Sequence, residues 1–192
     1  LLAQSAHSET LRVAVAANFS QTLRRLQPLY EQQSGHRLKM SSASTGTLYA
    51  QILHGAPGDI CLAADKKRPL SLTEKDLASA DSALVYARGS LVLWSPDPRL
   101  ISKNSSAVLT HADFDHIAIA NPNTAPYGVA AMQVITHLDQ ANSEDGLDDK
   151  LSGKMVQGEN IAQTWQFVVS GNAQLGFIDR KSTRLNSSHV AL

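Results

Sequence analysis

The 192-residue sequence contains a single cysteine, Cys61. One cysteine excludes an internal disulfide and any metal site that needs several thiolates. Cys61 lies in the apolar run Ile60–Ala63, which favours a buried, unreactive thiol over a nucleophile. A chain with one cysteine suits the cytosol and the exterior equally, so this count does not decide the compartment.

Long apolar runs and an excess of one charge are also missing. No stretch approaches the roughly 18 apolar residues that a membrane-spanning helix needs. The 17 basic residues balance the 17 acidic ones, so neither nucleic acid nor an anionic membrane is expected as a partner. With 43% hydrophobic and 18% charged residues, the composition is that of a folded chain that can hold one large or two small domains.

Sequence motifs of common enzymes are absent as well. The chain has no G-x-S-x-G, no G-x-x-x-x-G-K-[ST] and no G-x-G-x-x-G, so a serine hydrolase elbow and nucleotide cradles are unsupported. The histidines lack metal-ligand spacing; His111 and His116, with two aspartates between them, permit a weak metal site but fit a solvated loop better. We therefore predict a protein that is not an enzyme, with no cofactor and no bound metal cation.

The first part of the chain alternates strand-like and helix-like segments. Strands are predicted at 11–16, 38–42 and 59–64, the first helix is predicted to begin at a cap, Asn18 or Ser20, and to end at Gly35, and the second covers 48–54. Asp65 is expected to cap a further short helix. This rhythm is typical of a parallel, doubly wound α/β unit, in which ligands bind beyond the carboxyl ends of the strands.

The second part of the chain also alternates strand-like and helix-like segments, but its sequence is not a repeat of the first part. An extended run over 83–94, bent at Gly89, is followed by predicted strands at 117–120, 155–157 and 175–178, helices at about 129–138 and 161–169, and an acidic loop at 142–149. We predict two lobes, residues 10–85 and 86–178, joined near residues 86–90, with a ligand cleft between them.

One segment of the first lobe combines five hydroxyl side chains with a glycine and no charge: Ser41–Thr47. It lies between a predicted strand and a predicted helix, where backbone N–H groups and the positive end of the helix dipole can face an anion. Taken alone, the segment is better explained as an ordinary Ser/Thr helix cap. Both interpretations remain open at this point.

Five motifs in order resemble the periplasmic molybdate-binding proteins of ABC importers. They are Val15–Phe19, Ser41–Ile52, Gly55–Asp65, Ala120–Gly128, and Glu159–Ile161 with Leu175–Phe177. The resemblance covers about residues 10 to 178. It implies the two-lobed fold of periplasmic binding proteins, each lobe a mostly parallel doubly wound sheet, with the first lobe incomplete in this chain.

The resemblance also implies a ligand set. Asn18, with Ala17 beside it, falls on the first strand–helix turn, and Thr45, with Ser44 beside it, falls on the hydroxyl ligand of the second turn. Tyr127 and Ile161 fall on positions that offer a backbone N–H. The implied partners are molybdate or tungstate and the membrane permease of an ABC importer, the implied location is the periplasm, and the protein is expected to be a monomer.

Several other functions remain as alternatives. Sulfate or another oxyanion is the alternative ligand; an enzyme of phosphate-ester chemistry and a ligand-sensing regulatory domain are further alternatives.

The two ends of the sequence differ from the rest. Residues 1–9 resemble the end of a secretory leader. From Asp179 to residue 192 the sequence back-translates to a common short-read sequencing adapter, so we interpret it as a foreign tail that replaces the natural continuation after Ile178.

Overall fold

The computed structural model describes residues 8–101, 105–111, 114–142 and 146–183. The chain divides into two compact units, Leu1–Val85 and Tyr86–Leu192, which are described one at a time. Most of the predicted leader and the end of the predicted tail lie outside the described residues.

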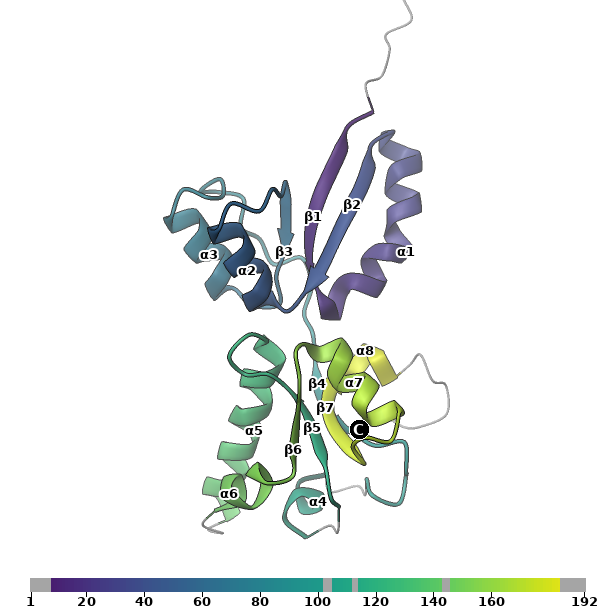
Figure 1. Ribbon diagram of the computed structural model, residues 1–192, viewed down its shortest axis with the longest axis vertical. Coiled ribbons are helices and arrows are strands. Elements are labelled where there is room, and N and C mark those ends of the chain that lie inside the picture. Colours follow the sequence, from purple (N-terminus) through teal and green to yellow (C-terminus); the bar gives the residue numbers. More distant parts are fainter. Residues whose placement is uncertain (1–7, 102–104, 112–113, 143–145, 184–192) are drawn as a thin grey trace, which may run out of the picture. The chain divides into compact units, whose positions relative to one another are not determined.

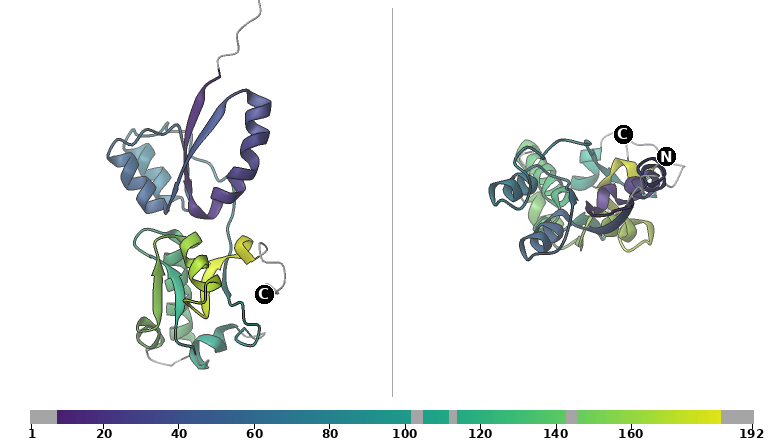
Figure 2. Two further views of the ribbon diagram at one scale, coloured as in Figure 1. Left: turned by 45° about the vertical axis from the view of Figure 1, so that its right-hand side comes forward. Right: turned by 90° about the horizontal axis from the view of Figure 1, so that it is seen from above.

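Unit 1 is built around a parallel sheet with the strand order β2-β1-β3 (Figure 1). Its elements are β1 (Thr10–Ala16), α1 (Ala17–Ser34), β2 (Arg37–Ala43), α2 (Thr45–Leu53), β3 (Ile60–Leu62) and α3 (Lys67–Glu74). The crossovers from β1 to β2 and from β2 to β3 run in opposite directions, so right-handed connections place α1 and α2 on opposite faces of the sheet. Figures 1 and 2 show this arrangement. The α/β prediction for this part is confirmed.

The core of unit 1 is centred on the middle strand. Val13 and Val15 of β1 are buried with Leu23 of α1, and side chains of the two flanking strands pack against them. Gly35 ends α1 in the left-handed conformation (φ 75°), and its N–H donates to the Glu31 carbonyl. The predicted end of this helix is therefore confirmed.

Three predicted boundaries in unit 1 are wrong. Neither Asn18 nor Ser20 caps α1, because the helix begins at Ala17, and Ala16 stands at the cap position. Helix α2 begins at Thr45, three residues before the predicted start, since the Ser44 hydroxyl is its cap. Strand β3 covers only Ile60–Leu62, because its pairing with β1 ends at Leu62.

Unit 2 contains a mixed sheet with the order β4-β7-β5-β6, in which β4 alone runs antiparallel to its neighbour. Its elements are β4 (Leu91–Trp94), α4 (Ser105–His111), β5 (Ile117–Ala120), α5 (Pro126–Asn142), α6 (Leu147–Ser152), β6 (Met155–Gly158), α7 (Ile161–Val169), β7 (Leu175–Asp179) and α8 (Arg180–Thr183). The prediction of a mostly parallel sheet is confirmed.

Alternation along β5 and β7 separates two cores on the two faces of this sheet. Ile117 and Ile119 pack with α5 and α6 in one cluster, whereas Ala118 packs with Val168 of α7 in the other. The second cluster also holds both tryptophans of the chain, Trp94 and Trp165. Figures 1 and 2 show α5 and α7 on opposite sides of the strands.

Three predictions for unit 2 need correction, and one helix was missed. Residues 83–88 form no regular strand, although Leu91–Trp94 does. Helix α5 begins at Pro126 rather than near residue 129, because proline is well suited to the first helical position. The end of the predicted acidic loop folds as α6, whose Leu147 and Leu151 are buried against the core, and α4 was not predicted at all.

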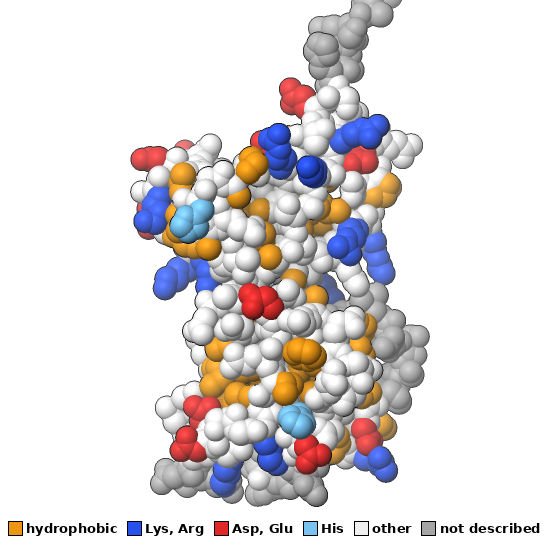
Figure 3. All heavy atoms as spheres, viewed as in Figure 1, with side chains coloured by type: hydrophobic (Ala, Val, Ile, Leu, Met, Phe, Trp, Pro, Cys, Tyr) orange, Lys and Arg blue, Asp and Glu red, His pale blue; other side chains and the backbone are white. Residues whose placement is uncertain are grey.

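Charged side chains of both signs are scattered over the face shown in Figure 3, with apolar side chains between them. Exposed apolar side chains of unit 1 include Leu26 and Leu29 of α1. Within the described residues, no helix combines the length and the apolar character needed to span a bilayer.

Candidate functional site

The first candidate donors of unit 1 lie where β1 passes directly into α1. Ala17 and Asn18 are the first two residues of the helix, so their N–H groups precede its first internal hydrogen bond. Among the described residues, no side chain caps this helix. The amide oxygen of Asn18 is buried and has no hydrogen-bond partner in the described part of the chain. This oxygen is an acceptor, as are the oxygens of an oxyanion, so the donors that this turn offers an anion are the N–H groups of Ala17 and Asn18.

The second pair of candidate residues begins α2 at the end of β2. Ser44 is the cap: its hydroxyl accepts from the N–H of Thr47 at 3.3 Å and lies 2.7 Å from the Thr47 hydroxyl. Thr45 is the first residue of the helix and is only 2% exposed. Because Ser44 engages the N–H of the third helical residue, the N–H groups of Thr45 and Gly46 remain at the open end of the helix.

The hydroxyl of Thr45 is oriented by a residue far away in the sequence. The N–H of Ala64, just after β3, donates to Thr45 Oγ1 at 3.1 Å. A hydroxyl that accepts one hydrogen bond keeps its own proton for donation. Thr45 therefore presents both an N–H and an O–H as neutral donors, and sequence reasoning did not identify Ala64 as the residue that arranges this.

Pairing in register brings these two helix starts together at one edge of the unit 1 sheet. Strands β1 and β2 are adjacent and parallel, and Ala16 pairs with Ala43 at their carboxyl ends. Asn18 and Thr45 lie two residues beyond those ends. We call this group, consisting of Ala17, Asn18, Ser44 and Thr45, the unit 1 half-site.

Unit 2 has a matching pair of helix starts. Pro126 opens α5 and has no N–H, so Tyr127 offers the first N–H of that helix. Asn160 caps α7, and its Oδ1 accepts from the N–H groups of Ala162 and Gln163 at 3.0 and 3.2 Å. This cap leaves the N–H of Ile161 as the first donor of α7.

The loops that carry these two helix starts are tied to each other. Strands β5 and β6 are adjacent and parallel, with Ala120 paired to Gly158. Beyond the strands, the Asn121 N–H donates to the Gly158 carbonyl at 2.7 Å and the Thr124 hydroxyl donates to the Glu159 carbonyl at 3.3 Å. Tyr127 and Ile161, which we call the unit 2 half-site, are thus held at one edge of the sheet.

Two glycines allow the helices of the unit 2 half-site to approach the strands. A Cβ at Gly128 would stand 2.1 Å from the Ala120 carbonyl oxygen, and a Cβ at Gly158 would stand 2.7 Å from the Thr164 nitrogen. Both obstacles are backbone atoms, so a larger residue would displace the start of α5 or α7.

The side chains of Tyr127 and Ile161 are buried. Ile161 is 4% exposed, and the Tyr127 hydroxyl donates to the carboxylate of Asp179 at 2.7 Å. The contribution that these two residues can make to an anion site is therefore their backbone N–H, as the family resemblance implies.

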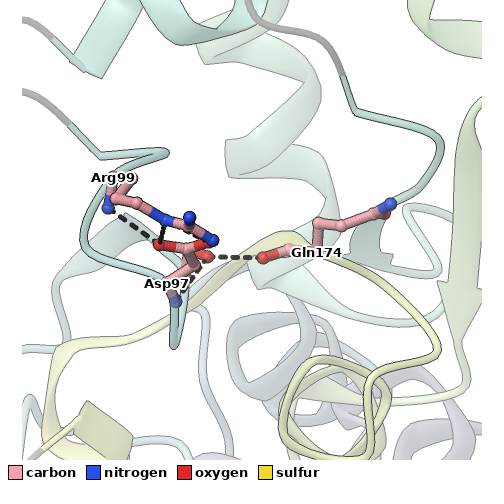
Figure 4. Close-up of polar contacts among 4 residues, drawn as sticks. Asp97, Arg99 and Gln174 are labelled. Atoms are coloured by element: carbon pink, nitrogen blue, oxygen red, sulfur yellow. Dashed lines mark hydrogen bonds and ion pairs between the residues drawn. The ribbon is translucent and has the colours of Figure 1, made fainter.

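One ion pair of unit 2 lies at the other edge of its sheet. Figure 4 shows the Arg99 guanidinium on the Asp97 carboxylate, which follows the antiparallel strand β4, with Gln174 nearby at the beginning of β7. The hydrogen bonds from Arg99 lower the pKa of Asp97 to about 2. Because β4 is antiparallel to β7, this pair lies away from the carboxyl ends of β5 and β6 that carry the unit 2 half-site.

Reactive and metal-binding groups do not gather in the described parts of the chain. No group of three or more His, Cys, Asp or Glu side chains able to hold a metal ion occurs among the described residues. The weak metal site considered at His111–His116 includes Asp113, which lies outside them. Burial, followed by the charge of Asp65, raises the pKa of the Cys61 thiol, which disfavours the thiolate needed for nucleophilic attack.

Comparison with known proteins gives the family. The family model of bacterial extracellular solute-binding proteins matches residues 11–191. The chain belongs to this family. The prediction of a binding protein rather than an enzyme is thereby confirmed.

Individual relatives agree with this assignment. The chain is 43% identical over 178 residues to the Molybdate-binding protein ModA of Azotobacter vinelandii (93% of this chain, 68% of the relative). It is 37% identical to the protein of the same name from Rhodobacter capsulatus (92% and 67%). The solved structure of the Azotobacter vinelandii periplasmic molybdate-binding protein matches with a TM-score of 0.82 at 40% identity, over 90% of this chain and 72% of that one.

Proposed function

We propose that this solute-binding protein captures molybdate or tungstate in the periplasm and delivers it to the membrane permease of an ABC importer. One observation carries the proposal: each unit presents two helix N-termini with uncharged donors at the ends of adjacent parallel strands. This arrangement occurs in a chain that is 43% identical to a protein named for molybdate binding. We also propose that the protein is a monomer and that it does not bind nucleic acid.

The proposed ligands are the members of the two half-sites: Ala17, Asn18, Ser44, Thr45, Tyr127 and Ile161. Helix N-termini stabilise anions through oriented N–H groups and the helix dipole. In this proposal, donors from both units bind the same oxyanion. The Thr45 proton left for donation supports its side-chain role, and Asn18 contributes its N–H at the start of α1.

The donor chemistry accounts for the preferred ligand class. Molybdate and tungstate are dianions with four acceptor oxygens and no proton at neutral pH. A site made of N–H and O–H donors satisfies them, whereas the O–H of hydrogen phosphate would lack an acceptor. Each charge-assisted hydrogen bond is worth roughly 1.5–3 kcal/mol, so about six or seven of them support micromolar or tighter binding after ordering costs.

Isothermal titration of the full chain with molybdate, tungstate, sulfate and hydrogen phosphate tests the proposal. We expect saturable heat with one site for molybdate and tungstate, and a rise in the unfolding temperature that grows with ligand concentration. Hydrogen phosphate should not compete. Absence of both heat and thermal shift with molybdate and tungstate would refute the proposal, and displacement by sulfate at equal concentration would favour the sulfate alternative.

A further inference from the structure

The proposed hydroxyl ligand of unit 1 depends on a loop with little sheet support. Thr45 Oγ1 accepts from the N–H of Ala64, and that acceptance is what leaves the Thr45 proton available to an anion. Ala64 follows β3, which pairs with β1 over only three residues and lies at the edge of the sheet. Something other than the strand must hold the Ala64 N–H in place.

Asp65, the next residue, has the contacts to do this. Its Oδ1 accepts from the backbone N–H of Arg68 at 2.9 Å, and its Oδ2 pairs with the Arg68 guanidinium. Both side chains are partly buried, with 20% of Asp65 and 22% of Arg68 exposed. One carboxylate thus ties the loop after β3 to the first turn of α3 through two different bonds.

The pair also matters for the charge beside the unit 1 half-site. Asp65 balances the charge of Arg68, while Lys66 and Lys67 between them are exposed cations. A contact that fixes geometry and one that balances charge have opposite consequences when Asp65 is removed. Lost geometry weakens anion binding, whereas removal of a negative charge beside the half-site favours a dianion.

We propose that Asp65 is a positioning residue for oxyanion binding, which fixes the Ala64 N–H and through it the donating hydroxyl of Thr45. This inference rests on the proposed function. Asp65 acts here through Thr45 and is not itself a ligand. Donors that are already fixed in the folded protein bind a ligand more tightly, because the entropy cost of ordering them does not arise on binding.

A double-mutant cycle tests the proposal with molybdate as the probe. The full chain is titrated as wild type and as Asp65→Ala, Thr45→Val and the double variant. We expect Asp65→Ala to weaken binding about tenfold in the wild-type background and less than about twofold when Val replaces Thr45, because residues that act through one another are not additive. A residue that only supports the fold would weaken binding equally in both backgrounds, and that result would overturn the proposal.

Two milder variants separate geometry from charge. Asp65→Asn keeps an oxygen that can accept from the Arg68 N–H, and Arg68→Gln removes the ion pair but keeps that backbone bond. Each should weaken binding by about threefold at most, and again only while Thr45 is present. If Asp65→Ala does not fold, as judged by its melting curve, these two cycles decide the same question.

Other outcomes are equally decisive. Tighter binding by Asp65→Ala or Asp65→Asn that disappears at high salt would assign Asp65 to charge balance and overturn the positioning role. Unchanged binding in all three variants would overturn it too. A wild-type chain that binds no molybdate would instead refute the proposed function, which the titration of the wild type reveals before any variant is made.

Discussion

The two half-sites use the same architecture but different donor atoms. In unit 1 a side chain takes part, because Thr45 offers a hydroxyl as well as its N–H. In unit 2, Tyr127 and Ile161 have buried side chains and only their backbone N–H groups at the helix starts. Anion recognition by unit 1 can therefore be tested by replacing a side chain. The backbone donors of unit 2 can be tested only by substitutions that displace its helices.

The largest expected effect comes from moving a helix of unit 2. In Gly128→Ala the new Cβ meets the Ala120 carbonyl oxygen at 2.1 Å, so α5 must shift away from β5. We expect a loss of about 3 kcal/mol in the free energy of unfolding and strongly weakened molybdate binding. Denaturant unfolding followed by titration measures both.

Gly153→Ala is the matched control for this prediction. Gly153 has an ordinary φ of −71°, and a Cβ added there would meet no atom within 4 Å. This variant should match the wild type in binding and be as stable or slightly more stable. Equal behaviour of the two variants would remove the close approach of α5 as the reason for Gly128.

Loss of one side-chain donor in unit 1 is the next largest effect. Thr45→Val should weaken molybdate binding by about 10- to 100-fold, the value of one charge-assisted hydrogen bond. Thr73→Val is the control, since the Thr73 hydroxyl donates to the Leu70 carbonyl within α3. Titration of both variants measures the effect, and equal affinities would contradict a ligand role for Thr45.

The counterpart in unit 2 sharpens the comparison. Ile161→Val shortens the side chain of a proposed ligand but keeps its N–H. It should lower stability by about 1 kcal/mol and change the dissociation constant less than about twofold. A loss of affinity as large as that of Thr45→Val would show that the unit 2 half-site does not act through its backbone.

Loss of the α7 cap should lower the free energy of unfolding less than Gly128→Ala does. In Asn160→Ala the N–H groups of Ala162 and Gln163 lose their acceptor, at a cost of about 1 kcal/mol. Binding should weaken as well, because the start of α7 frays. Asn172→Ala, in an exposed turn of the same unit, is the control and should stay within about 0.5 kcal/mol of the wild type. Thermal melts with and without molybdate compare them.

The smallest effect concerns the charged edge of unit 2. The pKa of Asp97 is lowered from 3.8 to about 2 by Arg99. This contribution to stability is complete above pH 3.8 and is lost as the pH falls through about 2. The difference in melting temperature between wild type and Arg99→Gln should therefore shrink over this range. A difference that is constant from pH 5 to pH 2 would contradict it.

Local signals made much of the fold predictable. The periodicity predicted the start of α7 at Ile161, and Gly35 predicted the end of α1, because these signals act over only a few residues. Contacts between distant residues produced two of the errors: β3 ends at Leu62, where its pairing with β1 ends, and α6 forms because Leu147 and Leu151 reach the core of unit 2. The starts of α1, α2 and α5 were misplaced although their signals are local.

The candidate site was predictable to a different extent. The positions of Asn18, Thr45, Tyr127 and Ile161 came from the resemblance to a family, and their roles as ligands stay predictions. The Ala64 N–H on Thr45 could not be predicted, since no local pattern links residues 19 positions apart. The foreign nature of the chain from Asp179 onward also stays a prediction.

Both tryptophans, Trp94 and Trp165, pack in the same cluster of unit 2. Excitation of tryptophan therefore reports on unit 2 alone, and Trp165 lies one helical turn after Ile161. An emission change on adding molybdate would record the arrival of the anion at α7. Unfolding confined to unit 1 would be optically silent in such an experiment, so circular dichroism or a tryptophan introduced into unit 1 is needed to observe the half-site that contains Thr45.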